Sequence, residues 1–241
     1  MLVKLENPTL FSKSIDLISE LVLEVRLKFT EFGMCITAID PANVSMVNFR
    51  IPKSAFITYE AGQESLGVNL DNLKKILKRC GAKSSLILEQ KENFLEIRIE
   101  DRIKRVFSLN LIEIEAEDKE LPNWEFSSIV ELNSQDFVES IEDCAVVSDA
   151  CSFIVKDGKF LIEAKELNSA RSEFSSDEAS IKAENCSARY SLEYLQKFIK
   201  GSKLFDKTIL NFAQDHPLKI DLKKPDLNLS FILAPRKETE D

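Results

Sequence analysis

The sequence is poor in the residues that build most catalytic and metal centres. It has a single histidine, His216, which stands before Pro217 with no Ser or Cys beside it, and we predict a turn residue there rather than a general base. The five cysteines are odd in number and contain no Cys-x-x-Cys pair: Cys35, Cys80, Cys144, Cys151 and Cys186. We therefore expect no zinc site, and we predict buried free thiols in a reducing compartment.

Other absences exclude further classes. The six glycines are scattered, so no phosphate-binding loop is expected. No run approaches the roughly 18 apolar residues of a membrane span, and the amino terminus lacks a signal peptide's layout. The many carboxylates form no recognisable set of metal ligands, and solvated surfaces explain them better. We therefore expect a soluble, intracellular protein without a cofactor, and no catalytic site is recognisable in the sequence.

Positive charge is also in deficit. The chain has 32 Lys and Arg against 41 Asp and Glu, a formal net charge of −9. Affinity for nucleic acid comes mainly from neutralising phosphates, so an acidic protein normally repels it. If this protein meets DNA, one local surface must carry the cations.

The segment from Leu70 to Lys83 offers such a surface. At about 100° per residue, its apolar side chains share one face of a helix and its Lys and Arg side chains the opposite face. Gly81 is expected to end the helix. Ser191 to Lys203 repeats the pattern, with Gly201 expected as the stop. A Lys-rich solvated face is the ordinary explanation for one such helix, but two of them half a chain apart indicate a duplicated unit.

Other segments repeat in the same order. Phe11 to Asp16, within a helix predicted over 8–22, is answered by Phe137 to Glu142. The turn at Phe32-Gly33 is answered by Asp157-Gly158. Each half is predicted to hold two amphipathic helices and about eight short antiparallel strands. Residues 112–126 are acidic and contain a proline, so they are interpreted as a connector between domains 1–111 and 127–241.

Antiparallel sheets bury one face, so the helices should pack on the sheets and leave their polar sides on one surface. That surface would collect nine cations: Lys13, Lys74, Lys75, Lys78, Arg79, Lys83, Lys197, Lys200 and Lys203.

Five segments in order resemble the sliding DNA clamps of archaeal and eukaryotic replication, the proliferating cell nuclear antigen (PCNA) family. They are 39–47 (IDPANVSMV), 67–78 (GVNLDNLKKILK), Leu121-Pro122 with Phe126, His216-Pro217-Leu218 and Leu233-Ala234-Pro235-Arg236. The resemblance covers essentially the whole chain. It implies an α+β, duplicated two-domain clamp (processivity) fold, with antiparallel sheets outside and two helices per domain lining the inner face of a three-subunit ring.

The resemblance also implies function. Clamps of this family are not enzymes; they encircle duplex DNA without sequence specificity and raise the processivity of DNA polymerase. The clamp loader, flap endonuclease, DNA ligase and other replication and repair enzymes are implied as partners that insert short hydrophobic and aromatic peptide motifs. Their pocket would comprise Ile39, Val44, Met46, Leu121, Pro122, Phe126, Pro217, Ile232, Ala234 and Pro235. Without the resemblance, ordinary strand packing would be the favoured explanation for Ile39, Val44, Met46 and Ile232.

Subunits of the family join through edge strands, here 103–111 and 170–175. The resemblance places Arg105, Phe107, Leu109, Ala170 and Glu173 at that interface, where Arg105 and Glu173 could form a charge pair. Trp124, in the connector, is either a hinge anchor or a partner contact. Such a clamp would act in the cytoplasm, at the nucleoid, in an archaeon and in the nucleus of a eukaryote.

One helix departs from the family's pattern. Residues 135–146 should also face the hole, yet they offer Glu139, Glu142 and Asp143. Either DNA tilts toward the other helices, or this chain belongs to a mixed or checkpoint-type ring whose other subunits supply the charge. A monomeric metal-dependent nuclease that uses the acidic clusters is the alternative from another class.

Overall fold

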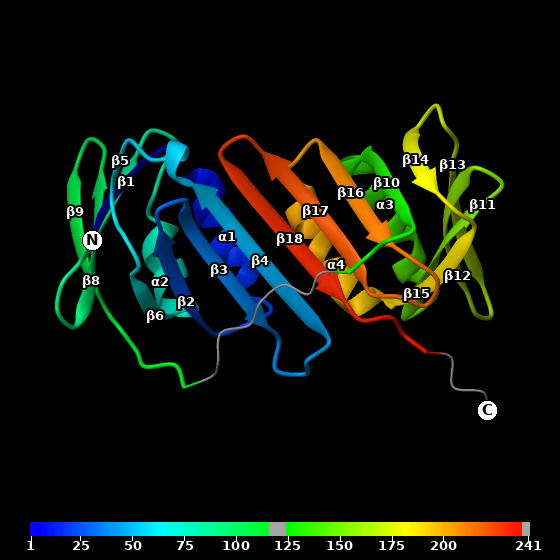
Figure 1. The fold of residues 1–241 in the computed structure, drawn as a ribbon, viewed down its shortest axis with the longest axis horizontal. Helices are drawn as coiled ribbons and strands as arrows, with labels where there is room; N and C mark the ends of the chain where they lie inside the picture. Colours follow the sequence, from blue (N-terminus) through cyan, green and yellow to red (C-terminus); the bar gives the residue numbers. More distant parts are fainter. Residues whose placement is uncertain (116–123, 238–241) are drawn as a thin grey trace. The chain divides into compact units, whose positions relative to one another are not determined.

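The structure is a computed structural model that describes residues 1–115 and 124–237. The chain divides into two compact units (Figure 1). The first comprises Met1–Pro41, Val47–Leu121 and Pro225–Asn228, and the second comprises Ala42–Met46, Pro122–Lys224 and Leu229–Asp241. None of the helices in the described ranges has the length and apolar character that a membrane span needs.

The first unit combines strands with two α-helices. A five-stranded antiparallel sheet has the order β5-β1-β7-β8-β9, formed by Thr58–Glu60, Leu2–Glu6, Ser85–Gln90, Phe94–Glu100 and Lys104–Asn110. A second run of neighbouring strands has the order β4-β3-β2-β6, formed by Ser45–Pro52, Gly33–Ile39, Glu24–Thr30 and Ser65–Asn69. Helices α1 (Thr9–Ile18) and α2 (Leu70–Leu77) lie together on one side of these strands, and a short 3-10 helix covers Lys53–Ala55.

The second unit uses the same plan. Strands β14, β10, β16, β17 and β18 are neighbours in that order and comprise Ala179–Ala183, Ser128–Asn133, Lys207–Phe212, Leu218–Lys224 and Leu227–Leu233. A four-stranded sheet has the order β13-β12-β11-β15, formed by Ser169–Phe174, Lys159–Lys165, Ala150–Lys156 and Cys186–Ser191. Helices α3 (Ser134–Val147) and α4 (Leu192–Ser202) contact each other.

The two strand orders match element for element, because β1 to β9 correspond to β10 to β18 and α1 and α2 to α3 and α4. The duplication that the repeated motifs predicted is therefore present. Each unit has nine strands among the described residues rather than about eight. The two predicted turns also recur, with Gly33 at φ 135° and Gly158 at φ 76°.

Alternation along the strands builds the cores. In β8, Leu95, Ile97 and Ile99 are fully buried while the residues between them are half-exposed. The core of the second unit contains a cluster of aromatic rings among its aliphatic side chains. The Phe153 ring meets those of Tyr190 at 5.2 Å and Phe160 at 5.7 Å in edge-to-face geometry, an arrangement that adds about 0.5–1.5 kcal/mol per pair beyond area burial.

Both glycine stops were predicted wrongly. Helix α2 ends at Leu77 with Lys78 as its right-handed cap, and Gly81 lies beyond it without a positive φ. Gly201 lies inside α4 and is buried. A Cβ at this position would lie 3.1 Å from the Phe231 ring and 3.2 Å from Leu222. Close packing, rather than chain reversal, therefore explains Gly201.

The residues after the last strand of each unit bond to an edge strand. Ile112 N donates to Gly67 O of β6 at 2.9 Å, and Arg236 N donates to Arg189 O of β15 at 2.7 Å. The start of the predicted connector is thus held on the first unit. Residues 116–123 of that connector lie outside the described residues.

Candidate functional site

The helix face of the first unit carries six of the nine predicted cations. Asn69 begins α2 by accepting a hydrogen bond from Asn72 N at 3.1 Å, and Leu70, Leu73 and Leu77 are buried beneath the helix. This seating turns the opposite side outward. Lys13 of α1 and four cations in or after α2 are exposed, whereas Lys74 is half-buried: the four are Lys75, Lys78, Arg79 and Lys83.

Lys74 and Lys78 are not free, because α1 supplies carboxylate partners. Asp16 Oδ1 lies 3.0 Å from Lys78 Nζ and 3.7 Å from Lys74 Nζ. Lys74 also pairs with Asp71 at 3.3 Å and donates to Ser19 Oγ at 2.9 Å. Among the described residues, Lys13, Lys75 and Lys83 form no such ion pair.

The helix face of the second unit carries the other three predicted cations. Lys197 Nζ lies 3.3 Å from Glu193 of the same helix and 5.0 Å above the Tyr194 ring. Lys200 is exposed. Lys203, the residue that caps α4, pairs with Glu142 of α3 at 2.8 Å.

Helix α3 is as acidic as predicted, but part of its charge is balanced within the unit. All three carboxylates are exposed. Glu142 pairs with Lys203, and Glu139 accepts a hydrogen bond from Gln135 at 2.8 Å. Sequence reasoning missed these partners and the role of Asp16, because interhelical pairs depend on how the helices pack.

Strands β9 and β13 lie at sheet edges, as the interface prediction requires. On β9, Phe107 is half-buried and Leu109 is buried. Leu109 can therefore contribute only its backbone to a contact at this edge. Arg105 already bonds to Asp101 and donates to Arg79 O at 2.9 Å.

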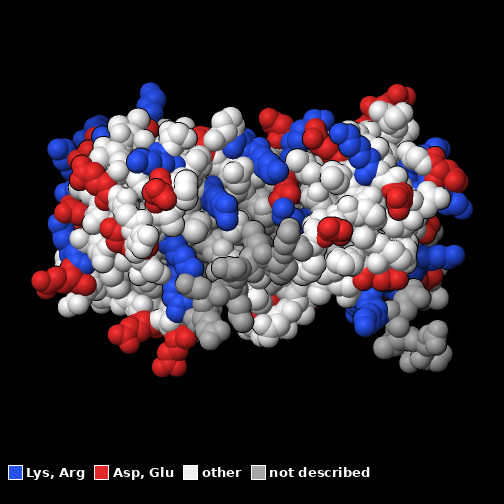
Figure 2. All heavy atoms as spheres, viewed as in Figure 1, with Lys and Arg blue, Asp and Glu red and all other residues white. Residues whose placement is uncertain are grey.

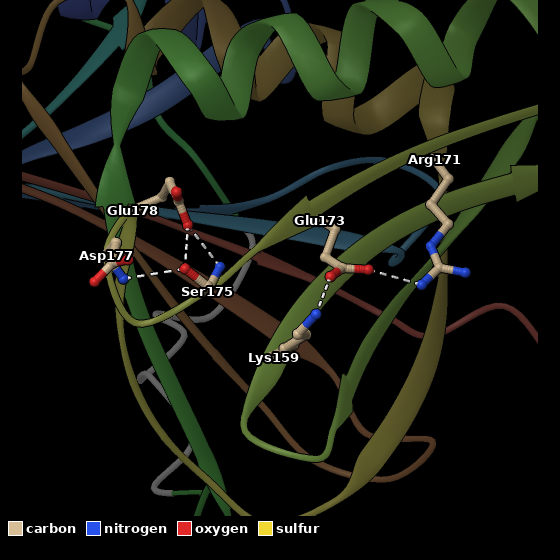
Figure 3. A network of polar contacts seen from close by, with 6 residues as sticks. All are labelled: Lys159, Arg171, Glu173, Ser175, Asp177 and Glu178. Atoms are coloured by element: carbon tan, nitrogen blue, oxygen red, sulfur yellow. Dashed lines mark hydrogen bonds and ion pairs between the residues drawn. The ribbon is translucent and has the colours of Figure 1, made fainter.

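On β13, Ala170 is half-buried and Glu173 is exposed. Figure 3 shows the Glu173 carboxylate between the side chains of Lys159 and Arg171. Glu173 pairs with Lys159 and with Arg171, the latter at 2.9 Å, and these bonds lower the pKa of its carboxyl. A charge pair between Arg105 and Glu173 across an interface would therefore have to replace bonds that both residues make in their own unit.

Exposed apolar side chains accompany both edges and were not singled out from the sequence. Val106 of β9 is 60% exposed, and Ile103 lies just before that strand. Val146, on the helix that packs against β13, is 83% exposed, and Leu167 in the turn before β13 is fully exposed. The sequence held no signal for them, because exposure depends on the final packing.

Most residues of the predicted peptide pocket belong to the second unit, while Ile39 is half-buried in the first. Met46 and Ile232 are 8% and 5% exposed, which fits the strand-packing interpretation. Five others are half-buried: Val44, Phe126, Pro217, Ala234 and Pro235. Val44 O accepts a hydrogen bond from Ala234 N at 2.9 Å, so these two segments adjoin. Leu121 and Pro122 lie outside the described residues.

Phe126 belongs to an aromatic cluster of the second unit. The rings of Trp124, Phe126 and His216 meet pairwise edge-to-face at 6.3–6.4 Å. The backbone oxygen of His216 accepts a hydrogen bond from the Tyr190 hydroxyl at 2.8 Å. The Trp124 ring therefore packs within the second unit, and both of its predicted roles, hinge anchor and partner contact, stay predictions.

A hollow beside β15 contains Pro235 but otherwise residues that sequence reasoning did not select: Ser152, Ser187, Ala188, Arg189, Gln214, Asp215, Arg236 and Lys237. Arg236 pairs with Asp149 at 2.7 Å and thereby lowers the pKa of that carboxyl. In residues 1–115 and 124–237, no group of three or more His, Cys, Asp and Glu side chains is arranged to hold a metal ion.

Comparison with known proteins decides the family. The residue pattern of the proliferating cell nuclear antigen N-terminal domain matches residues 1–120, and that of the C-terminal domain matches residues 120–237. The chain belongs to the proliferating cell nuclear antigen family. The resemblance carried by the five sequence segments is thus confirmed.

Relatives agree over nearly the whole chain. "DNA polymerase sliding clamp 1" of Thermococcus kodakarensis is 37% identical over 236 residues, which cover 95% of each chain. "DNA polymerase sliding clamp" of Pyrococcus furiosus is 33% identical over 237 residues, again 95% of each.

Solved PCNA structures share the fold. A chain of the PCNA2-PCNA3 complex from Sulfolobus tokodaii has a TM-score of 0.89 at 26% identity and covers 99% of this chain and 100% of its own. PCNA from Entamoeba histolytica has a TM-score of 0.91 at 24% identity, covers 98% of each chain and supports the fold alone. The predicted α+β two-domain PCNA fold is therefore confirmed.

Proposed function

We propose that this chain is a subunit of a sliding clamp that encircles duplex DNA and tethers DNA polymerase to it, without catalysing a reaction itself. The match of both PCNA domains along the chain carries this conclusion. The sliding-clamp names of relatives at 33–37% identity support it. In the archaeal setting of these relatives, the clamp would act in the cytoplasm at the nucleoid.

The helix faces are the proposed DNA-facing surface. They carry exposed cations on a protein whose net charge is −9. On the strand-side surface that Figure 2 shows, Lys and Arg are interspersed with Asp and Glu among uncharged residues. Mobile ammonium groups facing phosphates bind DNA without reading its sequence, so they hold a duplex and still permit movement along it.

Ring closure is proposed to pair β9 of one chain with β13 of the next. Both are edge strands, and unpaired edges offer backbone N–H and C=O groups for pairing. Exposed Val106 on one edge and Val146 and Leu167 beside the other would be covered in such a contact.

The peptide pocket is proposed on the second unit, around half-buried Val44, Phe126, Ala234 and Pro235. Apolar anchors of a short partner peptide would bury against these side chains. The polymerase, the clamp loader, flap endonuclease and DNA ligase are the proposed partners.

A primer-extension assay tests the function. An archaeal replicative polymerase, given a matching clamp loader and a long primed circular template, should make longer products with this protein than without it. Product lengths that do not change would overturn the proposal for the chain alone.

A mixed ring is a second candidate. A solved relative comes from a PCNA2-PCNA3 complex, and here Arg105 and Glu173 already have partners in their own unit. Native mass spectrometry separates the two. A species of three chains supports a self-sufficient ring, and a persistent 27.4 kDa monomer at micromolar concentration supports a mixed one.

A further inference from the structure

Each unit contains an ion pair that joins its two helices at the same place. Asp16 of α1 holds Lys78 at 3.0 Å, and Glu142 of α3 holds Lys203 at 2.8 Å. Lys78 and Lys203 are the residues that cap α2 and α4. In each unit, therefore, a carboxylate of the first helix forms an ion pair with the lysine that caps the second helix.

The carboxylates of the two pairs are equivalent by sequence, whereas the two lysines are equivalent as the residues that cap their helices. Asp16 and Glu142 close the matching segments that begin at Phe11 and Phe137. The acidic residue differs in length between the units, yet the bond to the capping lysine is present in both. The same geometry thus occurs twice with different side chains.

Stability alone is a weak reason for these pairs. The side chains are 57% and 45% exposed in Lys78 and Asp16, and 49% and 51% exposed in Lys203 and Glu142. Exposed ion pairs contribute little to the free energy of unfolding, since water screens them. The ion pairs should affect the binding of a ligand that contacts the same lysines more than they affect stability.

A DNA phosphate on this face would compete with the carboxylate for the ammonium group. If the lysine stays paired, its carboxylate repels the phosphate. If the lysine binds the phosphate instead, the free energy of its ion pair is lost. Each of these ion pairs therefore reduces the free energy that one lysine–phosphate contact would contribute to DNA binding.

We infer that Asp16 and Glu142 are positioning residues that loosen the grip of the clamp on DNA by holding Lys78 and Lys203. This rests on the proposed function, which places these helices against DNA. A weak grip suits a protein that must move along the duplex, because each step breaks its phosphate contacts.

The size of the effect follows from the worth of exposed pairs. Removing both carboxylates should tighten binding by about 2- to 30-fold, the range that two exposed ion pairs represent. Two lysines freed for phosphates should also steepen the slope of log K against log salt by up to about 2.

The test uses D16N, E142Q and the double variant of the full chain. Each amide keeps the size of the carboxylate, and the two single variants probe the units separately. The probe is a labelled linear duplex of about 40 base pairs, titrated by fluorescence anisotropy at several KCl concentrations. D143N is the matched control, because Asp143 is exposed on α3 and has no bonded lysine among the described residues.

The expected result is that E142Q tightens binding and steepens the salt slope more than D143N does, with D16N acting likewise. Equal effects of E142Q and D143N would overturn the inference, since only net charge would then matter. K75Q separates this failure from that of the proposed function. If K75Q weakens DNA binding while E142Q and D143N have equal effects, only the inference about the ion pairs is wrong. If K75Q has no effect on DNA binding, the proposed DNA-facing surface itself is wrong.

Discussion

Two neighbouring lysines on α2 should contribute unequally to DNA binding, Lys75 more than Lys74. Lys75 is exposed and forms no ion pair among the described residues. The Lys74 side chain is 23% exposed and has Asp16, Asp71 and Ser19 as partners. A phosphate can therefore take Lys75 without competition but must displace several groups to take Lys74.

The magnitudes follow from these partners. One phosphate contact gives a salt slope of about 0.9, which corresponds to about 8-fold in affinity at about 0.1 M salt. K75Q should lose up to that factor and leave stability unchanged. K74Q should change affinity by less than about 2-fold and lower the free energy of unfolding by about 1 kcal/mol, because it removes bonds that link α1 to α2.

Anisotropy titrations at several salt concentrations measure affinity and slope, and urea unfolding measures stability. Both variants remove one positive charge from the same helix, so each is the control for the other. The reasoning is refuted if K74Q weakens DNA binding and flattens the salt slope as much as K75Q while its stability is unchanged.

Three further predictions concern packing, assembly and partners. G201A should lower the free energy of unfolding by about 1 kcal/mol, because overpacking against Phe231 outweighs the gain in helix propensity. G81A should be neutral or stabilising, because only Ser84 Oγ lies near the new Cβ, at 3.7 Å. Equal urea midpoints for the two variants would contradict this. V106D should shift the species seen by native mass spectrometry toward monomer, and an unchanged distribution would place the subunit contact elsewhere. V44D should weaken a labelled partner peptide at least 10-fold with little change in unfolding, and retained affinity would move the pocket.

The duplicated plan could be predicted because it depends on local patterns. Alternation in Phe94–Glu100 defines a half-buried strand, and the apolar stripe over Leu70–Leu77 defines a helix whatever the rest of the chain does. Two such series in the same order indicate a repeat, and the structure shows both.

What failed depends on contacts between distant segments. Gly81 and Gly201 both stand near the end of a basic amphipathic segment, yet only at Gly201 would an added Cβ meet a buried ring. Met46 and Ile232 were predicted to line the peptide pocket, and that prediction is not tested by their burial, which makes Asp substitutions there a test of folding rather than of binding. Val44 is half-buried, so the V44D variant probes binding more directly.

The charge pattern was half predictable. The spacing placed lysines on one helix face but could not show which of them have carboxylate partners on the neighbouring helix. Asp16 and Glu142 belong to no distinguishing motif, and only the packing of α1 on α2 and α3 on α4 reveals their partners.

Topological release tests the central claim most directly. The protein is loaded on a nicked circular duplex, washed at a salt concentration that removes simple binders, and then treated with a restriction enzyme that linearises the DNA. A clamp that encircles DNA stays on the closed circle and leaves through the new ends within minutes. Retention that is the same before and after the cut would contradict encirclement.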